Sequence, residues 1–326
     1  NPGDAEAYHN RGVAKAGKRD YKGAIDDYNS AIRLNPHFTE AYYNRGVAYS
    51  LLGRSDEAIA EFSTAIETDP NFIEAYYNRG IEYAHNGEDD LALADFSRAL
   101  ELDHEYVAAY NNRGVIFGRK GMHREAIADY TRALEINPQF IETLFNRGIE
   151  YSRMGRLQEA ADDYSRALEI DPGNPDILYN RGIVLGKMGQ AEGAIADYLA
   201  CLEKNPRSAE AHNNLGVEYS RLGLFDTSLE HYTKAIAINP RFVEAYNNRG
   251  VLFNRMGRYD EAIADFSHAI EIFDQDVPGI NAGTEEKSDH VIIQDQEPAG
   301  GHVPGQVDEP VTTQPTEPAF EPAPAA

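Results

Sequence analysis

The fold is decided by YNRGVAYSLLGRSDEAIAEFSTAIETDP, residues 43–70, because the same pattern returns throughout the chain. The tripeptide that begins at Asn44 recurs every 34 residues without any insertion. The first residues of its eight copies are Asn10, Asn44, Asn78, Asn112, Asn146, Asn180, Asn214 and Asn248. This constant register predicts a repeat architecture, in which each unit packs mainly on its neighbours.

Each unit carries two apolar stripes at helical spacing. In the second repeat, Tyr42 and Tyr49 belong to the first stripe, and Phe62 and Ile66 belong to the second. Gly53 lies between the stripes, where a left-handed backbone ends a helix without a Cβ penalty. We therefore expect every unit to be a hairpin of two helices.

Small residues at fixed offsets complete the pattern. Ala58 follows the glycine of the tripeptide by twelve residues, Ala65 comes seven later, and an Asn-Pro or Asp-Pro pair closes most units. The period, these small residues and the boundary proline resemble the tetratricopeptide repeat, over about 270 residues. The resemblance implies an all-α solenoid, a right-handed superhelix of helix-turn-helix repeats, and the Asn-Arg-Gly form is most similar to bacterial members of the family.

The register also predicts the domain boundaries. Residues 1–4 are expected to be the end of a preceding repeat, because Asn1 and Pro2 align with Asn35 and Pro36. The eight repeats then occupy 5–38, 39–72, 73–106, 107–140, 141–174, 175–208, 209–242 and 243–273. Residues 274–326 hold 8 of the 16 prolines, which predicts a disordered, acidic, Pro-rich tail.

Charge and composition exclude several classes of function. The chain has 54 acidic and 30 basic residues, a net charge of −24, which opposes binding to nucleic acid and to anionic membranes. Because no apolar run approaches the roughly 18 residues that span a bilayer, we expect a soluble, cytoplasmic protein. A periplasmic or secreted location stays open, since the sequence begins at Asn1 and not at Met. No Cys and His cluster, phosphate loop or nucleophile elbow is present, so we expect no metal, no cofactor and no catalysis.

Arginine follows the asparagine in seven of the eight copies, where the family usually has leucine. Helical geometry turns this position toward the second helix, where a buried guanidinium needs an anionic partner, and an acidic residue follows sixteen positions later. The expected ion pairs are Arg11–Asp27, Arg45–Glu61, Arg79–Asp95, Arg113–Asp129, Arg147–Asp163, Arg181–Asp197 and Arg249–Asp265. In the remaining copy Leu215 and His231 replace both partners. A ladder of arginines that binds anionic ligands is the alternative.

The asparagines lie on the opposite side of the first helix, where they resemble the asparagine ladder of peptide-binding tetratricopeptide arrays. The resemblance implies that Asn44, Asn78, Asn112, Asn146, Asn180 and Asn214 contact an extended peptide. Pockets beside them are expected at Tyr43, Tyr77, Phe145 and Tyr179, and a basic rim at Arg119, Arg153 and Lys187. Capping or solvation of the asparagines, and packing between first helices, are the alternatives. Glu82, Glu150 and Glu218 mark every second repeat, which we interpret as a trace of duplication.

These features favour a non-catalytic scaffold whose groove binds an extended segment of a protein partner, one with basic residues along an edge. Two alternatives stay open: a scaffold that self-associates through its end repeats, and the targeting region of a larger enzyme such as a glycosyltransferase. Glutamates stand where chaperone-binding members have lysines, so we expect no binding of chaperone C-termini.

Overall fold

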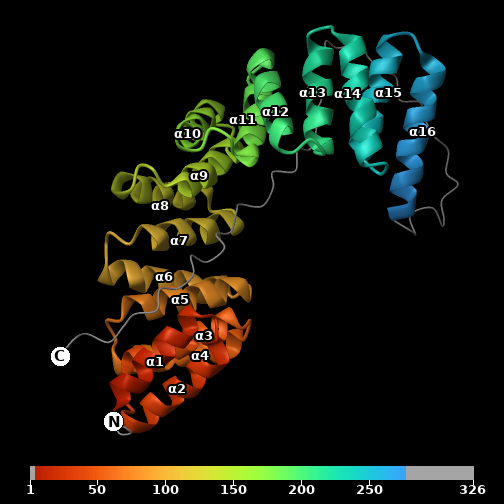
Figure 1. Ribbon diagram of the computed structural model, residues 1–326. Coiled ribbons are helices and arrows are strands. Elements are labelled where there is room, and N and C mark those ends of the chain that lie inside the picture. The colour runs from red at the N-terminus through yellow and green to blue at the C-terminus, as the bar shows by residue number, and fades with distance from the viewer. Residues whose placement is uncertain (1–3, 277–326) are drawn as a thin grey trace, which may run out of the picture. The chain divides into compact units, whose positions relative to one another are not determined.

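The computed structural model describes residues 4–276, which form sixteen helices and no strand. They divide after Glu150 into two compact units. The helices that begin in the first unit are α1 (Ala5–Gly17), α2 (Tyr21–Leu34), α3 (Thr39–Leu51), α4 (Ser55–Thr68), α5 (Ile73–His85), α6 (Asp89–Leu102), α7 (Val107–Arg119), α8 (His123–Ile136) and α9 (Ile141–Arg153). Those of the second are α10 (Leu157–Ile170), α11 (Pro175–Lys187), α12 (Ala191–Lys204), α13 (Ala209–Arg221), α14 (Phe225–Ile238), α15 (Val243–Arg255) and α16 (Tyr259–Asp276). The expected all-α repeat fold is confirmed (Figure 1).

Each repeat is a helical hairpin, and one residue with a positive φ forms the turn between its two helices. Gly53 takes a φ of 71°, and the chain then enters α4 within two residues. Six further glycines at the same place, from Gly87 to Gly257, also have positive φ, whereas the first repeat places Arg19 there at a φ of 61°. A side chain in this region costs about 1–2 kcal/mol, so glycine recurs because the turn requires it.

The glycine of the tripeptide allows the two helices of a hairpin to approach closely. A Cβ added to Gly46 would lie 2.7 Å from Phe62 Cε1, and one added to Gly80 would lie 2.8 Å from Phe96 Cε1. The two helices of a hairpin therefore cross at this glycine, with the aromatic ring of the second helix against the backbone of the first. This close approach explains why the glycine recurs even in the seventh repeat, where Leu215 replaces the arginine beside Gly216.

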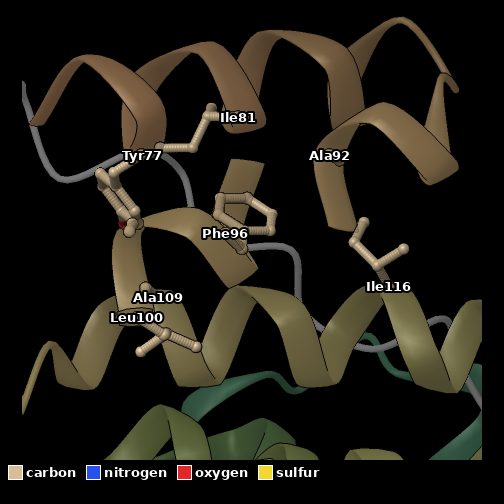
Figure 2. Packing of buried hydrophobic residues seen from close by; sticks show 8 residues of the cluster. Tyr77, Ile81, Ala92, Phe96, Leu100, Ala109 and Ile116 are labelled. Carbon is tan, nitrogen blue, oxygen red and sulfur yellow. The ribbon is translucent and has the colours of Figure 1, made fainter. Parts of the chain in front are cut away.

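The core lies between helices of neighbouring repeats as well as within hairpins. Figure 2 shows Phe96 of α6 packed beside Tyr77 and Ile81 of α5, with Leu100 of α6 and Ile116 of α7 completing the same cluster. Phe96 is 1% exposed and Ile116 is 2% exposed. Since this cluster joins three helices of two repeats, a single hairpin lacks part of its own core.

One boundary differs from the expectation. Helix α16 continues to Asp276, past the limit at 273, and Phe273 and Asp274 stand where most other units have an Asn-Pro or Asp-Pro pair. The expected tail from 277 onward and the residues before Asp4 lie outside the described residues. The superhelical sense of the array stays a prediction.

Candidate functional site

The arginines of the tripeptide contact the second helix of their own hairpin. Arg79 Nε donates to Asp95 Oδ2 at 2.7 Å and Arg79 Nη2 donates to Asp95 Oδ1 at 2.8 Å, so both carboxylate oxygens accept. The same two-pronged contact joins Arg11–Asp27, Arg113–Asp129, Arg181–Asp197 and Arg249–Asp265. The hydrogen bond to Asp95 raises the pKa of the Arg79 guanidinium. These arginines therefore stabilise hairpins and are not an open ladder for anions.

The Arg45–Glu61 pair of the second repeat differs from these pairs, because a single hydrogen bond joins it. Arg45 Nη2 donates to Glu61 Oε2 at 2.6 Å, but burial raises the pKa of the Glu61 carboxyl and the bond from Arg45 opposes that rise only in part. Arg147 belongs to the first unit and Asp163 to the second, so their pairing remains a prediction.

Six of the seven arginines also bond to the preceding repeat, a contact that the sequence interpretation missed. Arg79 Nη1 donates to Ser63 Oγ at 2.9 Å, and Ser63 lies sixteen residues before it. Equivalent bonds join Arg45 to Asn29, Arg113 to Ser97, Arg147 to Thr131, Arg181 to Ser165 and Arg249 to Thr233. The guanidinium thus holds the second helices of two successive repeats at once.

The contact between the sixth and seventh repeats lacks all three of these polar groups. Leu199 of the sixth repeat stands where the other repeats have the polar acceptor, and in the seventh Leu215 replaces the arginine and His231 replaces the acid. Leu215 is fully buried, and His231 Nδ1 lies 3.0 Å from His212 Nδ1. The Tyr219 ring stacks on His231, with centroids 5.3 Å apart. Burial lowers the pKa of His231 to about 4, so the pair is neutral near pH 7.

The asparagine row does not form an open surface, which corrects the expectation. Asn44 and Asn146 are fully buried and Asn78 is 8% exposed. Asn78 Nδ2 donates to Tyr43 Oη at 3.0 Å, and Asn112 Nδ2 donates to Tyr77 Oη at 3.1 Å. Further amides that contact the first helix of the preceding repeat are Asn44, Asn146, Asn214 and Asn248. Asn180 is partly buried and its amide donates to the Asp176 carbonyl.

The aromatic residues beside the row are likewise internal. Tyr43, Tyr77 and Phe145 are 2%, 7% and 6% exposed, so they form no side-chain pockets on an open face, and Tyr179 is partly buried. The Tyr43 ring packs edge-on against Phe72, with centroids 5.0 Å apart. Neighbouring first helices approach closely enough to cover both the amides and the rings, and packing is therefore the correct alternative for these residues.

Arg119 of the expected basic rim also joins successive repeats, as does Arg221 at the equivalent place in the seventh repeat. Arg119 forms an ion pair with Asp89 and donates to the Ala84 carbonyl, which lies 35 residues earlier. Arg221 Nη1 donates to the Gly186 carbonyl at 2.9 Å and to Glu218 Oε1 at 2.7 Å. Lys187 is exposed. Arg119 retains 38% side-chain exposure, so it remains accessible to a partner.

The three glutamates of alternate repeats are buried at interfaces between repeats. Glu82 accepts hydrogen bonds from Ser50 and Ser55, at 2.5 and 2.6 Å, and Glu150 Oε2 lies 2.5 Å from His123 Nδ1. A Cβ on Gly118 would lie 2.7 Å from Glu150 Oε1. The two-repeat period is therefore structural: each glutamate meets a small or polar surface of the repeat before it. In the sequence, only the recurrence of the glutamate in every second repeat pointed to this contact, because the position of Ser50, Gly118 and Gly186 is small or polar in the other repeats as well.

A pocket of about 220 Å³ opens between α5 and α7. Ile81, Ala84, Phe96, Val115 and Ile116 form its apolar part, and His85, Asn112 and Arg119 supply polar groups. It lies on the first-helix side of repeats three and four, where the sequence predicts the groove. Asn112 and Arg119 are the groove residues that line it.

No group of three or more metal-ligating side chains occurs in the described part of the chain. Among residues 4–276, the helices are too short or too polar to cross a bilayer.

Comparison with known proteins defines the class. A tetratricopeptide repeat model matches residues 39–72, 73–106, 107–140, 209–242 and 243–276, together more than half of the chain. Related repeat models match 18–53, 129–161, 150–189 and 175–207. The chain belongs to the tetratricopeptide repeat family, whose members are in general non-catalytic scaffolds for protein interaction.

Solved structures give the same class. YrrB, described as a tetratricopeptide repeat protein with an unusual peptide-binding site, is 27% identical over 56% of this chain and 95% of its own, with a TM-score of 0.53. A MamA structure is 26% identical over 56% of this chain and 99% of its own, with a TM-score of 0.51. The C-terminal part of a repeat protein from Cytophaga hutchinsonii, 17% identical with a TM-score of 0.62, covers 74% of this chain and 98% of its own. No curated protein matches the chain significantly.

Proposed function

We propose that the first-helix face of repeats three and four binds an extended segment of another protein. The observation that carries this proposal is the pocket between α5 and α7, whose apolar floor is surrounded by His85, Asn112 and Arg119. Its volume of about 220 Å³ is below the roughly 300–1,000 Å³ of small-molecule sites, which favours a peptide side chain over a cofactor. The described peptide-binding site of YrrB supports the same class of ligand.

The ligand class follows from the surroundings of the pocket. An apolar side chain suits Ile81, Val115 and Ile116, whereas the polar groups at the pocket can bond to a peptide backbone. Glu40 and Glu74 lie in the first turns of α3 and α5, and the chain as a whole carries −24 charges. We propose a partner segment that combines one large apolar residue with lysines or arginines, with an association rate that falls as salt rises.

The test uses a random peptide display library, selected on the full chain. Enriched peptides are then titrated against the chain by fluorescence anisotropy. His85→Trp places a large ring at the pocket, and His37→Trp is the matched control, because His37 is exposed outside it. We expect His85→Trp to weaken binding at least tenfold, about 1.4 kcal/mol, and His37→Trp to leave it unchanged.

Two results would contradict the proposal. One is a library selection without any enriched peptide. The other is equal affinity of the His85→Trp variant and the unmodified chain for every enriched peptide. An alanine scan of the asparagine row is a poorer test, because Asn146 is buried and its loss would disturb the packing.

A further inference from the structure

An ion pair holds Arg119 at the pocket between α5 and α7. Arg119 Nε donates to Asp89 Oδ2 at 3.1 Å and Arg119 Nη2 donates to Asp89 Oδ1, so both carboxylate oxygens accept. Arg119 ends α7 and lines the pocket, whereas Asp89 begins α6 and does not line it. The pair therefore joins repeats three and four at the edge of the pocket.

The later repeats lack the acid that makes this pair. The residue thirty positions before each equivalent basic residue is His123 for Arg153, Leu157 for Lys187, Ala191 for Arg221 and Phe225 for Arg255. The bond to the preceding first helix, in contrast, recurs: Arg221 donates to the Gly186 carbonyl as Arg119 donates to the Ala84 carbonyl. The carbonyl contact thus belongs to the repeat pattern, and the carboxylate contact accompanies the pocket.

The stacking of repeats does not account for Asp89. The side chains of Arg119 and Asp89 are 38% and 21% exposed, and an ion pair that is open to water contributes little to stability. Repeats seven and eight stack without such a pair, since Arg255 Nη1 donates to Ser220 Oγ and the guanidinium lies over the Phe225 ring. The acid at position 89 therefore calls for a reason other than stability.

We propose that Asp89 positions Arg119 and neutralises its charge, so that the pocket takes an apolar side chain beside a neutral acceptor and discriminates against a carboxylate. This rests on the peptide site proposed above and specifies its ligand. The neutral acceptor is a main-chain carbonyl or a side-chain amide of the bound segment. Asp89 is a positioning residue, since it acts on the ligand through Arg119.

The donors of Arg119 leave one contact for such an acceptor. A guanidinium has five N–H groups. Asp89 accepts from two of them, and the Ala84 carbonyl accepts from Nη1 at 3.4 Å and from Nη2 at 3.3 Å. Within residues 4–276 the second N–H of Nη1 has no acceptor, and a ligand in the pocket that Arg119 lines can accept from it. Because two partners already fix the guanidinium, it loses little freedom when a ligand binds.

The neutralised charge decides which ligands the pocket favours. An unpaired guanidinium would attract a carboxylate and repel lysine or arginine. With Asp89 beside Arg119 the pair has no net charge, so it does not oppose the attraction of a basic segment to a chain that carries −24 charges. Specificity of this kind comes from removing an attraction to the wrong ligand.

The test compares forms of one peptide enriched from the display library. An alanine scan of the peptide identifies its apolar anchor, and the residue on either side of the anchor is then made Gln or Glu in separate peptides. We expect the unmodified chain to bind the Gln forms at least as tightly as the Glu forms. Asp89→Asn leaves the Arg119 charge unpaired and is expected to shift the ratio of the Kd values about fivefold toward a Glu form, the effect of one partly exposed charge pair.

Asp90→Asn is the matched control, because Asp90 pairs with Lys120 at 2.8 Å and neither residue lines the pocket. It removes the same charge one position along α6 and is expected to leave the ratio unchanged. Asp89→Asn combined with Arg119→Gln is expected to restore the ratio of the unmodified chain, since the guanidinium is then absent. Urea midpoints of the two single variants are expected to agree closely.

Equal ratios for Asp89→Asn and the unmodified chain would overturn the role of Asp89. If His85→Trp still weakened binding, the peptide site itself would stand, so the two failures are distinguishable. A strong preference of the unmodified chain for a Glu form would also overturn the proposal, because Arg119 would then bind anions in spite of Asp89. No effect of His85→Trp on any enriched peptide would overturn the peptide site and the role of Asp89 together.

Discussion

Arg79 Nη1 donates a hydrogen bond to Ser63 Oγ at 2.9 Å, although the two residues belong to successive repeats. The same guanidinium binds both carboxylate oxygens of Asp95 in its own hairpin. One side chain therefore fixes the crossing of two helices and the stacking of a third. A leucine at this place would supply the packing without the geometric restraint, because planar, two-pronged bonds fix orientation as well as distance.

Removing the acid of such a pair is expected to destabilise the chain substantially. Asp129 is 7% exposed, and its loss leaves the Arg113 guanidinium without a carboxylate in a largely buried place. We expect Asp129→Ala to lower the free energy of unfolding by about 2 to 4 kcal/mol, near the lower end for broken buried pairs because the Arg113 side chain keeps 20% exposure. Urea unfolding measures the effect.

Asp90→Ala is the control for that experiment. Asp90 also pairs with a basic residue, Lys120 at 2.8 Å, but its side chain is 88% exposed. A surface pair of this kind contributes little, so the urea midpoint is expected to stay the same. If the midpoints of the two variants were equal, the ion pairs of the tripeptide would not be important for stability.

The buried amides give a second test. Asn78→Ala removes the amide that donates to Tyr43 Oη at 3.0 Å and to the Glu74 carbonyl at 2.9 Å, at a position that is 8% exposed. We expect a loss of about 1 to 3 kcal/mol. Asn254→Ala is the matched control, because Asn254 is exposed on a first helix. Equal thermal unfolding of both variants would argue for a solvated asparagine row.

The seventh repeat offers a reconstruction experiment. Leu215→Arg alone buries a guanidinium without an anionic partner and is expected to cost about 3 kcal/mol or more. Adding His231→Asp supplies the carboxylate, and adding Leu199→Ser supplies the acceptor in the preceding repeat. We expect the combined variant to recover most of the loss, so that the effects are strongly non-additive. Additive losses in unfolding free energy would mean that the three places do not act together.

The buried histidines of the same repeat are expected to make the stability of the chain sensitive to acid. The pKa of His231 is lowered to about 4 by burial, with the neighbouring His212 and Lys234 adding to the shift and Glu230 opposing it. The unfolded chain binds a proton near pH 6.5, whereas the folded histidine does so only near pH 4. Stability from the neutral pair is therefore fully present above pH 6.5 and falls as the pH drops toward 4. The expected loss between pH 7 and pH 5 is about 2 kcal/mol.

A variant isolates this contribution from the many carboxylates. His212→Phe with His231→Leu removes both titrating rings from the contact between α13 and α14. We expect urea midpoints of this variant to change less between pH 7 and pH 5 than those of the unmodified chain. An identical pH dependence would show that the two histidines have the same pKa values in the folded and in the unfolded chain.

Contacts within a hairpin were predictable, because the chain supplies them at a constant offset. The sixteen-residue interval from Arg79 to Asp95 is readable as two helices joined by a short turn. Contacts between repeats were harder to predict. The bonds of Asn78 to Tyr43 and of Arg79 to Ser63 depend on how closely one hairpin packs on the next, which helical periodicity does not specify.

The sequence alone therefore determined the period, the two helices of each unit, the turn glycine and the family. Hydrophobic spacing and backbone preferences are local properties, and eight copies repeat them. The tertiary structure decided which polar residues are covered. Asn44 and Glu82 look like surface residues on an isolated helix, but an adjacent repeat removes them from water and supplies their hydrogen bonds. Burial is a property of the stacked array and not of the single repeat, so only the packed helices could reveal it.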